Sequence, residues 1–398
     1  MNRWTKWNGL EWPSAPVVAL LMMALLTSCG ERDRTAGIYF PLPEGPQVIM
    51  ESEDQAFSVD TLLTDLVRPW SMEFLPDGRT LITQRDGTLI QVRNGERLPN
   101  PISGVPDGLR DVKIHPEYES NGWLYLTYYQ DPEGDDGGYT VLIRGKLDGD
   151  AFVESEELYR AGPYQEAGGS FGSRLAFDHD GYLFFIIGGR TLDERHRRIA
   201  IQDLRSLSGK TLRLFDDGTI PADNPYADSV GVPLEIYSTG HRQHQGLVVH
   251  PETGTVWSTE HGEYGGDELN IIRPGRNYGW PLATYSLEYD STSISDDPLM
   301  VGMEPPVHYW TPSISPPGLD FATTDRYPGW NGDLFVASLS MQLLNRSVMD
   351  GETVLRDERL LEGIGRVRTV RLGPDGWLYL LTEDNGMLLR LLPAASND

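Results

Sequence analysis

The chain has almost no cysteine, since Cys29 is the only one among its 398 residues. A single thiol excludes an intramolecular disulfide and any CxxC metal or redox site. Basic charge is also scarce, because 33 Lys and Arg residues stand against 59 Asp and Glu residues, for a net charge of −26 at pH 7. Nucleic acids and anionic lipid surfaces are recognised through a basic face, so this balance argues against both as partners.

The apolar run near the N-terminus is too short to cross a bilayer as a helix. It covers the 12 residues 15–26, follows Arg3 and Lys6, and ends in Leu26-Thr27-Ser28-Cys29. A spanning helix needs about 20 apolar residues, so the run is typical of a secretory signal. Its end resembles the lipobox of bacterial lipoproteins, which implies a lipidated Cys29. An ordinary secretory signal that ends near a cysteine is the alternative. We expect a signal at residues 1–29, a polar tether at 30–58, and a lipid-anchored, periplasm-facing protein with no other membrane contact.

A turn followed by a short apolar strand recurs six times along the chain. Glycine at each turn allows the positive φ that hairpin turns need, and the runs that follow are aromatic and β-branched. The turn glycines, 44, 59, 73, 78 and 44 residues apart, are Gly78, Gly122, Gly181, Gly254, Gly332 and Gly376. A period of about 40–45 residues with inserted loops predicts an all-β, six-bladed β-propeller over residues 59–393. A sandwich or several small β domains is the alternative.

Short motifs follow one another from one expected blade to the next. The first is Arg68-Pro69-Trp70, and the third blade opens with Phe171-Gly172-Ser173-Arg174. The later motifs are Gly240-His241-Arg242, Glu260-His261-Gly262, Gly265-Gly266-Asp267-Glu268, Asn277-Tyr278-Gly279-Trp280, His308-Tyr309-Trp310 and Arg366-Val367-Arg368. In this order, over roughly residues 60–392, they resemble the quinoprotein glucose/sorbosone and aldose sugar dehydrogenases.

The resemblance implies oxidation of the anomeric carbon of an aldose to a lactone, with electrons leaving to an external acceptor. The family's cofactor is pyrroloquinoline quinone (PQQ), a planar ortho-quinone with three carboxylates. The resemblance assigns Arg366, Arg368 and Ser313 to cofactor binding. It assigns Arg242 both to the cofactor and to the stabilisation of negative charge that develops there. Guanidinium groups bind carboxylates in a bidentate manner, which suits this cofactor. The alternative is that Arg366 and Arg368 are two solvent-facing residues on an edge strand.

Calcium is the second cofactor that the resemblance implies. The carbonyl groups of Gly262 and Glu263 occupy the family's Ca²⁺ position. Glu260, Asp267 and Glu268 add the hard oxygen atoms that Ca²⁺ prefers. The alternative is that these acids are ordinary turn residues.

Several positions depart from the family pattern. The family's general base is a His where this chain has Ser170, and a neutral hydroxyl is a poor base near pH 7. The family's Ile-Gly-Asp turn ends in Gly189, and a loop that carries a Gln is contracted to residues 106–109. His244, two residues after Arg242, is the candidate replacement base; a loop His that is merely solvated is the alternative.

Other chemistries have weaker support. Residues 168–172 match G-x-S-x-G, but that elbow needs a following helix, and a strand is expected here. No HExxH or P-loop pattern occurs. A Ca²⁺-dependent lactonase-like propeller would need one acid from each blade, whereas the acids here cluster in one loop. The main rival is a catalytically degenerate propeller that binds a sugar or a protein partner.

Overall fold

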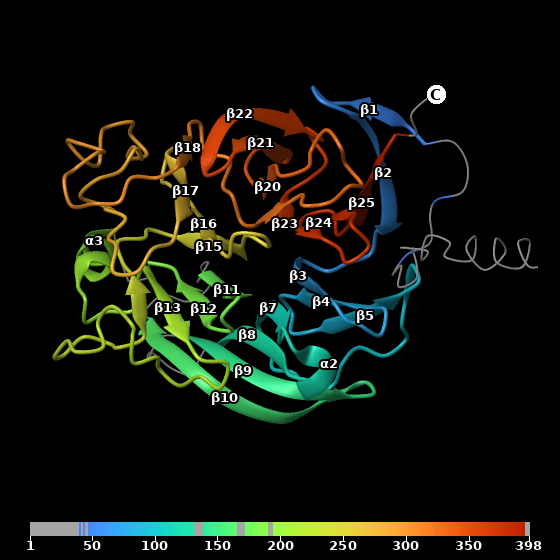
Figure 1. Ribbon diagram of the computed structural model, residues 1–398, viewed down its shortest axis with the longest axis horizontal. Helices are drawn as coiled ribbons and strands as arrows, with labels where there is room; N and C mark the ends of the chain where they lie inside the picture. The colour runs from blue at the N-terminus through green and yellow to red at the C-terminus, as the bar shows by residue number, and fades with distance from the viewer. Residues whose placement is uncertain are drawn as a thin grey trace, which may run out of the picture.

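The strands of the protein form a closed ring of six antiparallel sheets around one axis, as Figure 1 shows. The computed structural model describes residues 40, 43, 47–130, 138–164, 172–189 and 194–394. Within these ranges nearly all regular structure is β, which confirms the all-β, six-bladed β-propeller. The two helices there are α2 (Tyr118–Asn121) and α3 (Glu194–Gln202). Neither is long and apolar enough to cross a membrane.

Five blades place their strands in chain order from the axis outward, and the sixth places β23, β24 and β25 in that order with β2 outside them. The innermost strands are β3 (Pro69–Phe74), β7 (Leu109–Ile114), β11 (Gly172–Phe177), β15 (His244–Val249), β19 (Leu319–Phe321) and β23 (Val367–Leu372). The second strands are β4 (Arg79–Gln84), β8 (Leu124–Gln130), β12 (Leu183–Ile187), β16 (Val256–Glu260), β20 (Leu334–Ala337) and β24 (Leu378–Thr382). The third strands are β5 (Leu89–Arg93), β9 (Gly138–Asp148), β13 (Lys210–Leu214), β17 (Asp267–Ile271), β21 (Leu344–Asp350) and β25 (Leu388–Pro393). The outer strands are β6 (Glu96–Arg97), β10 (Ala151–Tyr164), β14 (Ile236–Ser238), β18 (His308–Trp310), β22 (Thr353–Leu360) and β2 (Ala56–Leu63).

The six repeated glycine turns join each innermost strand to the second strand of its blade. All six glycines have φ between +71° and +90°, a region that side chains with a Cβ rarely adopt. The turn repeat therefore marks the same corner of every blade, as the sequence predicts.

The N-terminal strands close the ring. Strand β2 pairs with β25, so the sixth blade contains chain from both ends, and β1 (Ile49–Glu51) adds a further strand outside β2. Phe57 in β2 is buried against Trp330, with ring centroids 5.1 Å apart. Residues 49–51 and 56–58 thus belong to the folded sheet, and the expected tether at 30–58 extends too far. The misplaced boundary reflects a strand whose partner lies more than 300 residues away.

One buried arginine connects all six blades at the axis. Arg174, the third residue of β11, has 1 % of its surface exposed. Its donors reach Ser71 Oγ (2.9 Å), Asp111 Oδ1 (3.2 Å), Gln245 O (3.4 Å), Pro317 O (3.3 Å) and Thr369 Oγ1 (2.7 Å). Burial lowers the pKa of Arg174 to about 9, while Asp111 opposes that shift.

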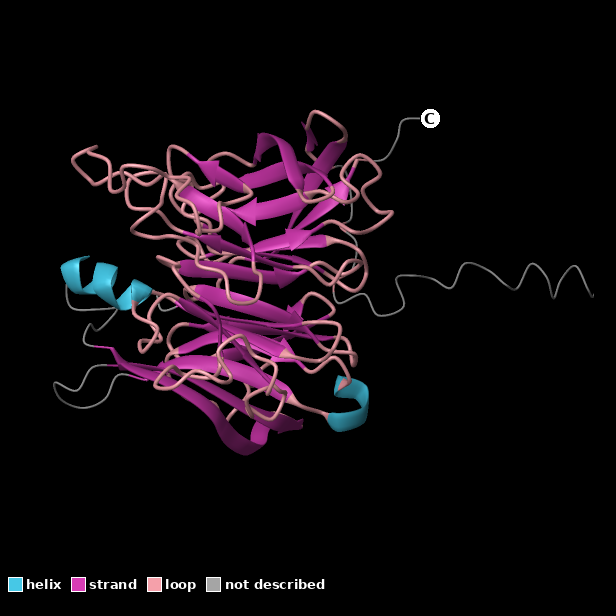
Figure 2. Ribbon diagram, turned by 60° about the vertical axis from the view of Figure 1, so that its left-hand side comes forward, coloured by secondary structure: helices cyan, strands magenta, loops and turns pink. Residues whose placement is uncertain are grey.

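The same contacts fix the direction of the innermost strands. Ser71, Asp111, Arg174 and Thr369 are each the third residue of their strand, and they meet at one level of the axis. The innermost strands therefore begin at one opening of the ring, the upper mouth, and end at the other, the lower mouth. Helices α3 and α2 lie on opposite faces of the disc (Figure 2). Helix α3 follows the end of a second strand and α2 the end of an innermost strand, and these two ends lie at opposite mouths.

Candidate active site

Arginine side chains converge on the upper mouth. They come from the starts of innermost strands or the ends of second strands. We call this set the arginine cluster; its members are Arg68, Arg85, Arg110, Arg242, Arg366 and Arg368. Arg85, Arg368 and Arg68 repel Arg110, and burial together with this repulsion lowers the pKa of Arg110 to about 9. A concentration of positive charge in so acidic a chain indicates a site for an anion.

The carboxylate of Glu383 opposes part of this charge. Arg368 Nε donates to Glu383 Oε2 at 2.9 Å, a second nitrogen of Arg368 contacts the same oxygen, and Arg85 Nη1 lies 3.3 Å from Oε1. Burial raises the pKa of Glu383, but Arg368 and Arg85 outweigh burial and hold it below its usual value. Glu383 pairs with Arg85 and Arg368, and Glu263 pairs with Arg242, so these two carboxylates do not neutralise all six arginines and the mouth keeps capacity for further oxyanions.

Arg366 and Arg368 differ in their surroundings. Arg368 is the second residue of β23 and has 6 % of its surface exposed. Arg366 precedes the strand and is half-buried, and its Nη1 donates to the carbonyl of Leu339 at 3.3 Å. Both lie near His261, whose pKa is lowered to about 3, first by burial and then by Arg368, Arg242 and Arg366. The structure therefore brings together the three arginines that the sequence singles out.

Arg242 is held rigidly at this mouth. Its backbone N–H donates to Glu260 Oε2 at 2.7 Å, and Glu260 also contacts His241 Nδ1 at 3.0 Å and accepts from Asn270 at 2.7 Å. Its Nη1 donates to the carbonyls of His261 (2.8 Å) and Gly262 (2.9 Å), and its Nε forms an ion pair with Glu263 at 2.7 Å. Glu260 is thus a positioning residue for Arg242.

The remaining acids of the 260–268 segment are also engaged with protein groups. Asp267 accepts from the Gly262 N–H at 2.8 Å, from Ser313 Oγ at 2.8 and 2.9 Å, and from the Ser315 N–H at 2.7 Å. Ser313, expected at the cofactor, therefore donates to Asp267. Burial and the nearby Glu260 raise the pKa of Glu268 well above its usual value, which favours its neutral form.

These contacts leave no ready calcium site in the described part of the chain. Within it, no group of three or more His, Cys, Asp or Glu side chains is placed to hold a metal ion. The Gly262 carbonyl, one of the two expected ligands, accepts from Arg242. The described groups do not fit Ca²⁺ as they stand, and the ligand set of Gly262, Glu263, Glu260, Asp267 and Glu268 stays a prediction from the resemblance.

His244 is not a loop residue. It begins β15, is fully buried, packs 3.6 Å from the ring of His241, and shares a hydrogen bond of 2.9 Å between Nδ1 and Ser258 Oγ. Burial, aided by His241, lowers its pKa well below the usual value. A fully buried, weakly basic imidazole does not suit a base that must contact a sugar. Ser170 lies outside the described residues.

Gly189 has a steric role. Its N–H donates to the carbonyl of Arg242 at 2.8 Å, and a Cβ at this position would lie 2.5 Å from that oxygen. Glycine at 189 therefore allows the backbone of Arg242 to approach β12. Position 189 therefore lacks the carboxylate of the family pattern and instead makes a close backbone contact, which a side chain would disturb.

Arg85, Arg110, His261 and Glu383 were missed by the sequence reasoning. Arg110 had a detectable signal, because it is the second residue of β7, as Arg368 is of β23, and follows the contracted loop at 106–109. Its Nη1 donates to the carbonyls of Gly108 and Leu109 at 2.8 and 2.9 Å. The Arg110 guanidinium thus holds the end of the short loop. Glu383 has no such signal, since only the tertiary structure brings it to Arg85.

Comparisons with known proteins agree with this geometry. The family model described as glucose / sorbosone dehydrogenase matches residues 66–390. The chain is 39% identical over 351 residues to aldose sugar dehydrogenase YliI of Escherichia coli strain K12, covering 84% of this chain and 93% of that one. The apo-form of the soluble aldose sugar dehydrogenase of Escherichia coli superposes with a TM-score of 0.80 at 37% identity, over 85% of this chain and 99% of the other. The PQQ-bound aldose sugar dehydrogenase of Streptomyces coelicolor gives a TM-score of 0.66 at 28% identity, over 84% and 98%.

Proposed function

Because the chain belongs to the glucose/sorbosone dehydrogenase family, we propose that it is a PQQ-dependent oxidoreductase that converts the anomeric carbon of an aldose to a lactone. The observation that carries the proposal is the excess of guanidinium groups over carboxylates at the upper mouth. The three carboxylates of PQQ carry the opposite charge, and each can accept two hydrogen bonds from one guanidinium group. The electrons would then leave to an external acceptor.

Each arginine has a distinct part in this proposal. PQQ supplies the quinone that accepts the hydride from the sugar. Arg366 and Arg368 would hold its carboxylates, and Arg368 would then give up part of its contact with Glu383. Arg242, fixed through its backbone by Glu260, supplies positive charge that stabilises negative charge as it develops. Glu260 holds the backbone of Arg242 in place before binding, whereas Arg368 has to give up part of its contact with Glu383.

Calcium enters the proposal with a condition. A Ca²⁺ ion at the Gly262 carbonyl would compete with the Arg242 guanidinium, which donates to that oxygen at 2.9 Å. The ion would therefore bind together with a shift of Arg242, and no step of the mechanism is derived through it.

A second candidate function rests on the missing base. Ser170 stands where the family has His, and His244 is fully buried. These two observations favour a propeller that binds a sugar, a protein partner or PQQ without turning over. Oxidation of an aldose by the PQQ-loaded protein separates the two candidates.

Arg366→Ala is expected to weaken PQQ binding by about one to two decades, because it removes a charge-assisted contact of roughly 1.5–3 kcal/mol. Its thermal unfolding should change little, since the side chain is half-buried and makes one long contact. Arg368→Ala should weaken binding as much and also lower stability, because it leaves Glu383 with less compensation. Quinone absorbance during titration measures the affinity.

Arg273→Ala is the matched control, because Arg273 lies on the surface with Glu352 at 2.9 Å and takes no part in the upper mouth. It should leave PQQ affinity unchanged. If both Arg366→Ala and Arg368→Ala bind PQQ with wild-type affinity, these two residues do not contact the cofactor.

We also propose that the protein is anchored in the bacterial cell envelope through lipidated Cys29, facing the periplasm. Cys29→Ser should release the domain into the soluble periplasmic fraction, because a buried acyl chain contributes about 0.8 kcal/mol per CH₂ to membrane binding. Fractionation of cells followed by immunoblotting measures the distribution. Sedimentation of the serine variant with membranes would contradict the anchor.

A further inference from the structure

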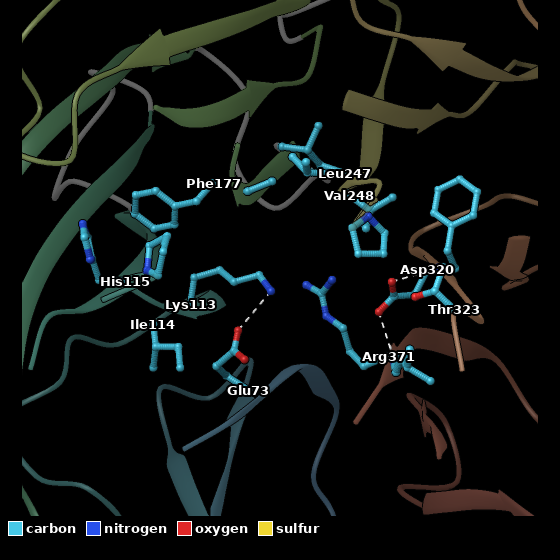
Figure 3. A pocket seen from close by; sticks show the side chains of 16 residues that line it. Glu73, Lys113, Ile114, His115, Phe177, Leu247, Val248, Asp320, Thr323 and Arg371 are labelled. Atoms are coloured by element: carbon cyan, nitrogen blue, oxygen red, sulfur yellow. Dashed lines mark hydrogen bonds and ion pairs between the residues drawn. The ribbon is translucent and has the colours of Figure 1, made fainter. Parts of the chain in front are cut away.

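A pocket lies at the lower mouth, away from the arginine cluster. It has a volume of about 370 Å³ and is built from the last residues of the innermost strands, with Glu73, Lys113, Phe177, Val248, Asp320 and Arg371 among its walls (Figure 3). Arg371 is five residues beyond Arg366, so it lies roughly 16 Å farther along β23 at about 3.3 Å per residue. Arg174 and its partners close the axis between the two mouths.

Arg371 is the chemically distinctive group of this pocket. It has only 7 % of its surface exposed, and its guanidinium points into the pocket between Lys113 and Asp320 (Figure 3). In the part of the chain that the structure describes, neither its Nε nor its Nη2 has a hydrogen-bond partner. These two N–H groups form one edge of the guanidinium, with the spacing that an oxyanion accepts in a bidentate manner.

The acids around Arg371 form their hydrogen bonds or ion pairs with other groups. Glu73 forms an ion pair with Lys113 at 3.0 Å. Asp320 accepts from the N–H groups of Phe321 and Leu372, each at 2.9 Å, and burial raises its pKa, while the nearby charge of Arg371 opposes that shift. No ion pair joins Arg371 to any described carboxylate. A buried cation with an unused donor edge favours an anionic ligand, because burial of polar groups without partners is unfavourable.

The other walls define the rest of the ligand. Phe177, Leu247 and Val248 give the pocket an apolar side, opposite the charged groups of β7, β19 and β23. We propose that the lower mouth binds a small organic carboxylate with an apolar body, whose two oxygens accept from Nε and Nη2 of Arg371. A single donor edge suits one carboxylate. This inference does not depend on the proposed dehydrogenase function.

Benzoate is the probe for this site, benzamide its neutral counterpart, and inorganic phosphate an oxyanion without an apolar body. Calorimetric titration of the full chain should detect benzoate, with weaker binding of phosphate and none of benzamide. R371Q should weaken benzoate binding by roughly tenfold or more, as expected for loss of a charge-assisted bidentate contact. R371K, which keeps the charge and loses the donor edge, should fall between. R273Q is the matched arginine control and should bind as the wild type does.

Circular dichroism and thermal unfolding establish whether each variant is folded. If R371Q does not fold, the comparison is made between R371K and the wild type. Benzoate affinity should be the same with and without PQQ, because Arg174 separates the two mouths. The proposal is wrong if the wild type does not bind benzoate, or if benzamide or phosphate binds as tightly. Unchanged affinity in the folded Arg371 variants, or competition between benzoate and PQQ, would equally contradict it.

Discussion

Ser170→His is expected to raise the rate of aldose oxidation by the PQQ-loaded protein at least about tenfold. A positioned general base typically contributes 10²–10⁴ in rate, and a serine hydroxyl cannot accept a proton efficiently near pH 7. The changed loop at 106–109 and Gly189 limit how closely the variant can reproduce the family's site. A gain at the low end of the range is therefore expected.

The pH profile distinguishes a new base from an indirect effect. The gain should disappear as pH falls below the pKa of the introduced imidazole, because the protonated ring cannot accept a proton. Ser170→Asn, which adds a polar side chain without basicity, is the control and should show no gain. Gly189→Asp is unsuitable as a companion, since its Cβ would meet the carbonyl of Arg242 at 2.5 Å. Measurable PQQ binding without any oxidation by Ser170→His would favour the non-catalytic propeller.

Arg174→Met should destabilise the protein by about 3–5 kcal/mol, because it removes the guanidinium that pairs with the buried Asp111 and leaves that charge uncompensated. The same change removes hydrogen bonds to strands of several blades. Urea unfolding followed by tryptophan fluorescence measures the loss.

Two comparisons test that explanation. Arg174→Met combined with Asp111→Leu should recover part of the lost stability, because replacing both partners removes the unpaired charge. Arg160→Met, at an exposed ion pair with Glu157, should change stability by no more than about 1 kcal/mol. If Arg174→Met costs no more than Arg160→Met, Arg174 does not hold the blades together.

The architecture could be predicted from the sequence because its signal is local and repeated. Each blade carries the same glycine turn, and Gly78 and Gly376 adopt the positive φ that their position requires. The closing strand could not be found in this way. Residues 56–63 acquire their role only by pairing with β25, and no local pattern reveals a partner so far along the chain.

The site was predicted in part for the same reason. Arg242, Arg366 and Arg368 occur in motifs, and the structure brings them to one mouth. His244, expected on a loop, instead begins a strand, and its burial comes from packing against His241 and Ser258, which a position after a Gly-His-Arg turn does not reveal. Glu383 joins Arg85 from the other end of the chain, a contact that exists only once the ring has closed.

We propose that the upper mouth holds PQQ and uses it to oxidise aldoses. Purified protein without cofactor should be titrated with PQQ in the presence of Ca²⁺, followed by the quinone absorbance, and then mixed with aldoses. We expect saturable binding that Arg366→Ala weakens, and then bleaching of the oxidised quinone by an aldose. Saturable binding with no reduction by any aldose would contradict the enzyme, and absence of binding would contradict the cofactor site itself.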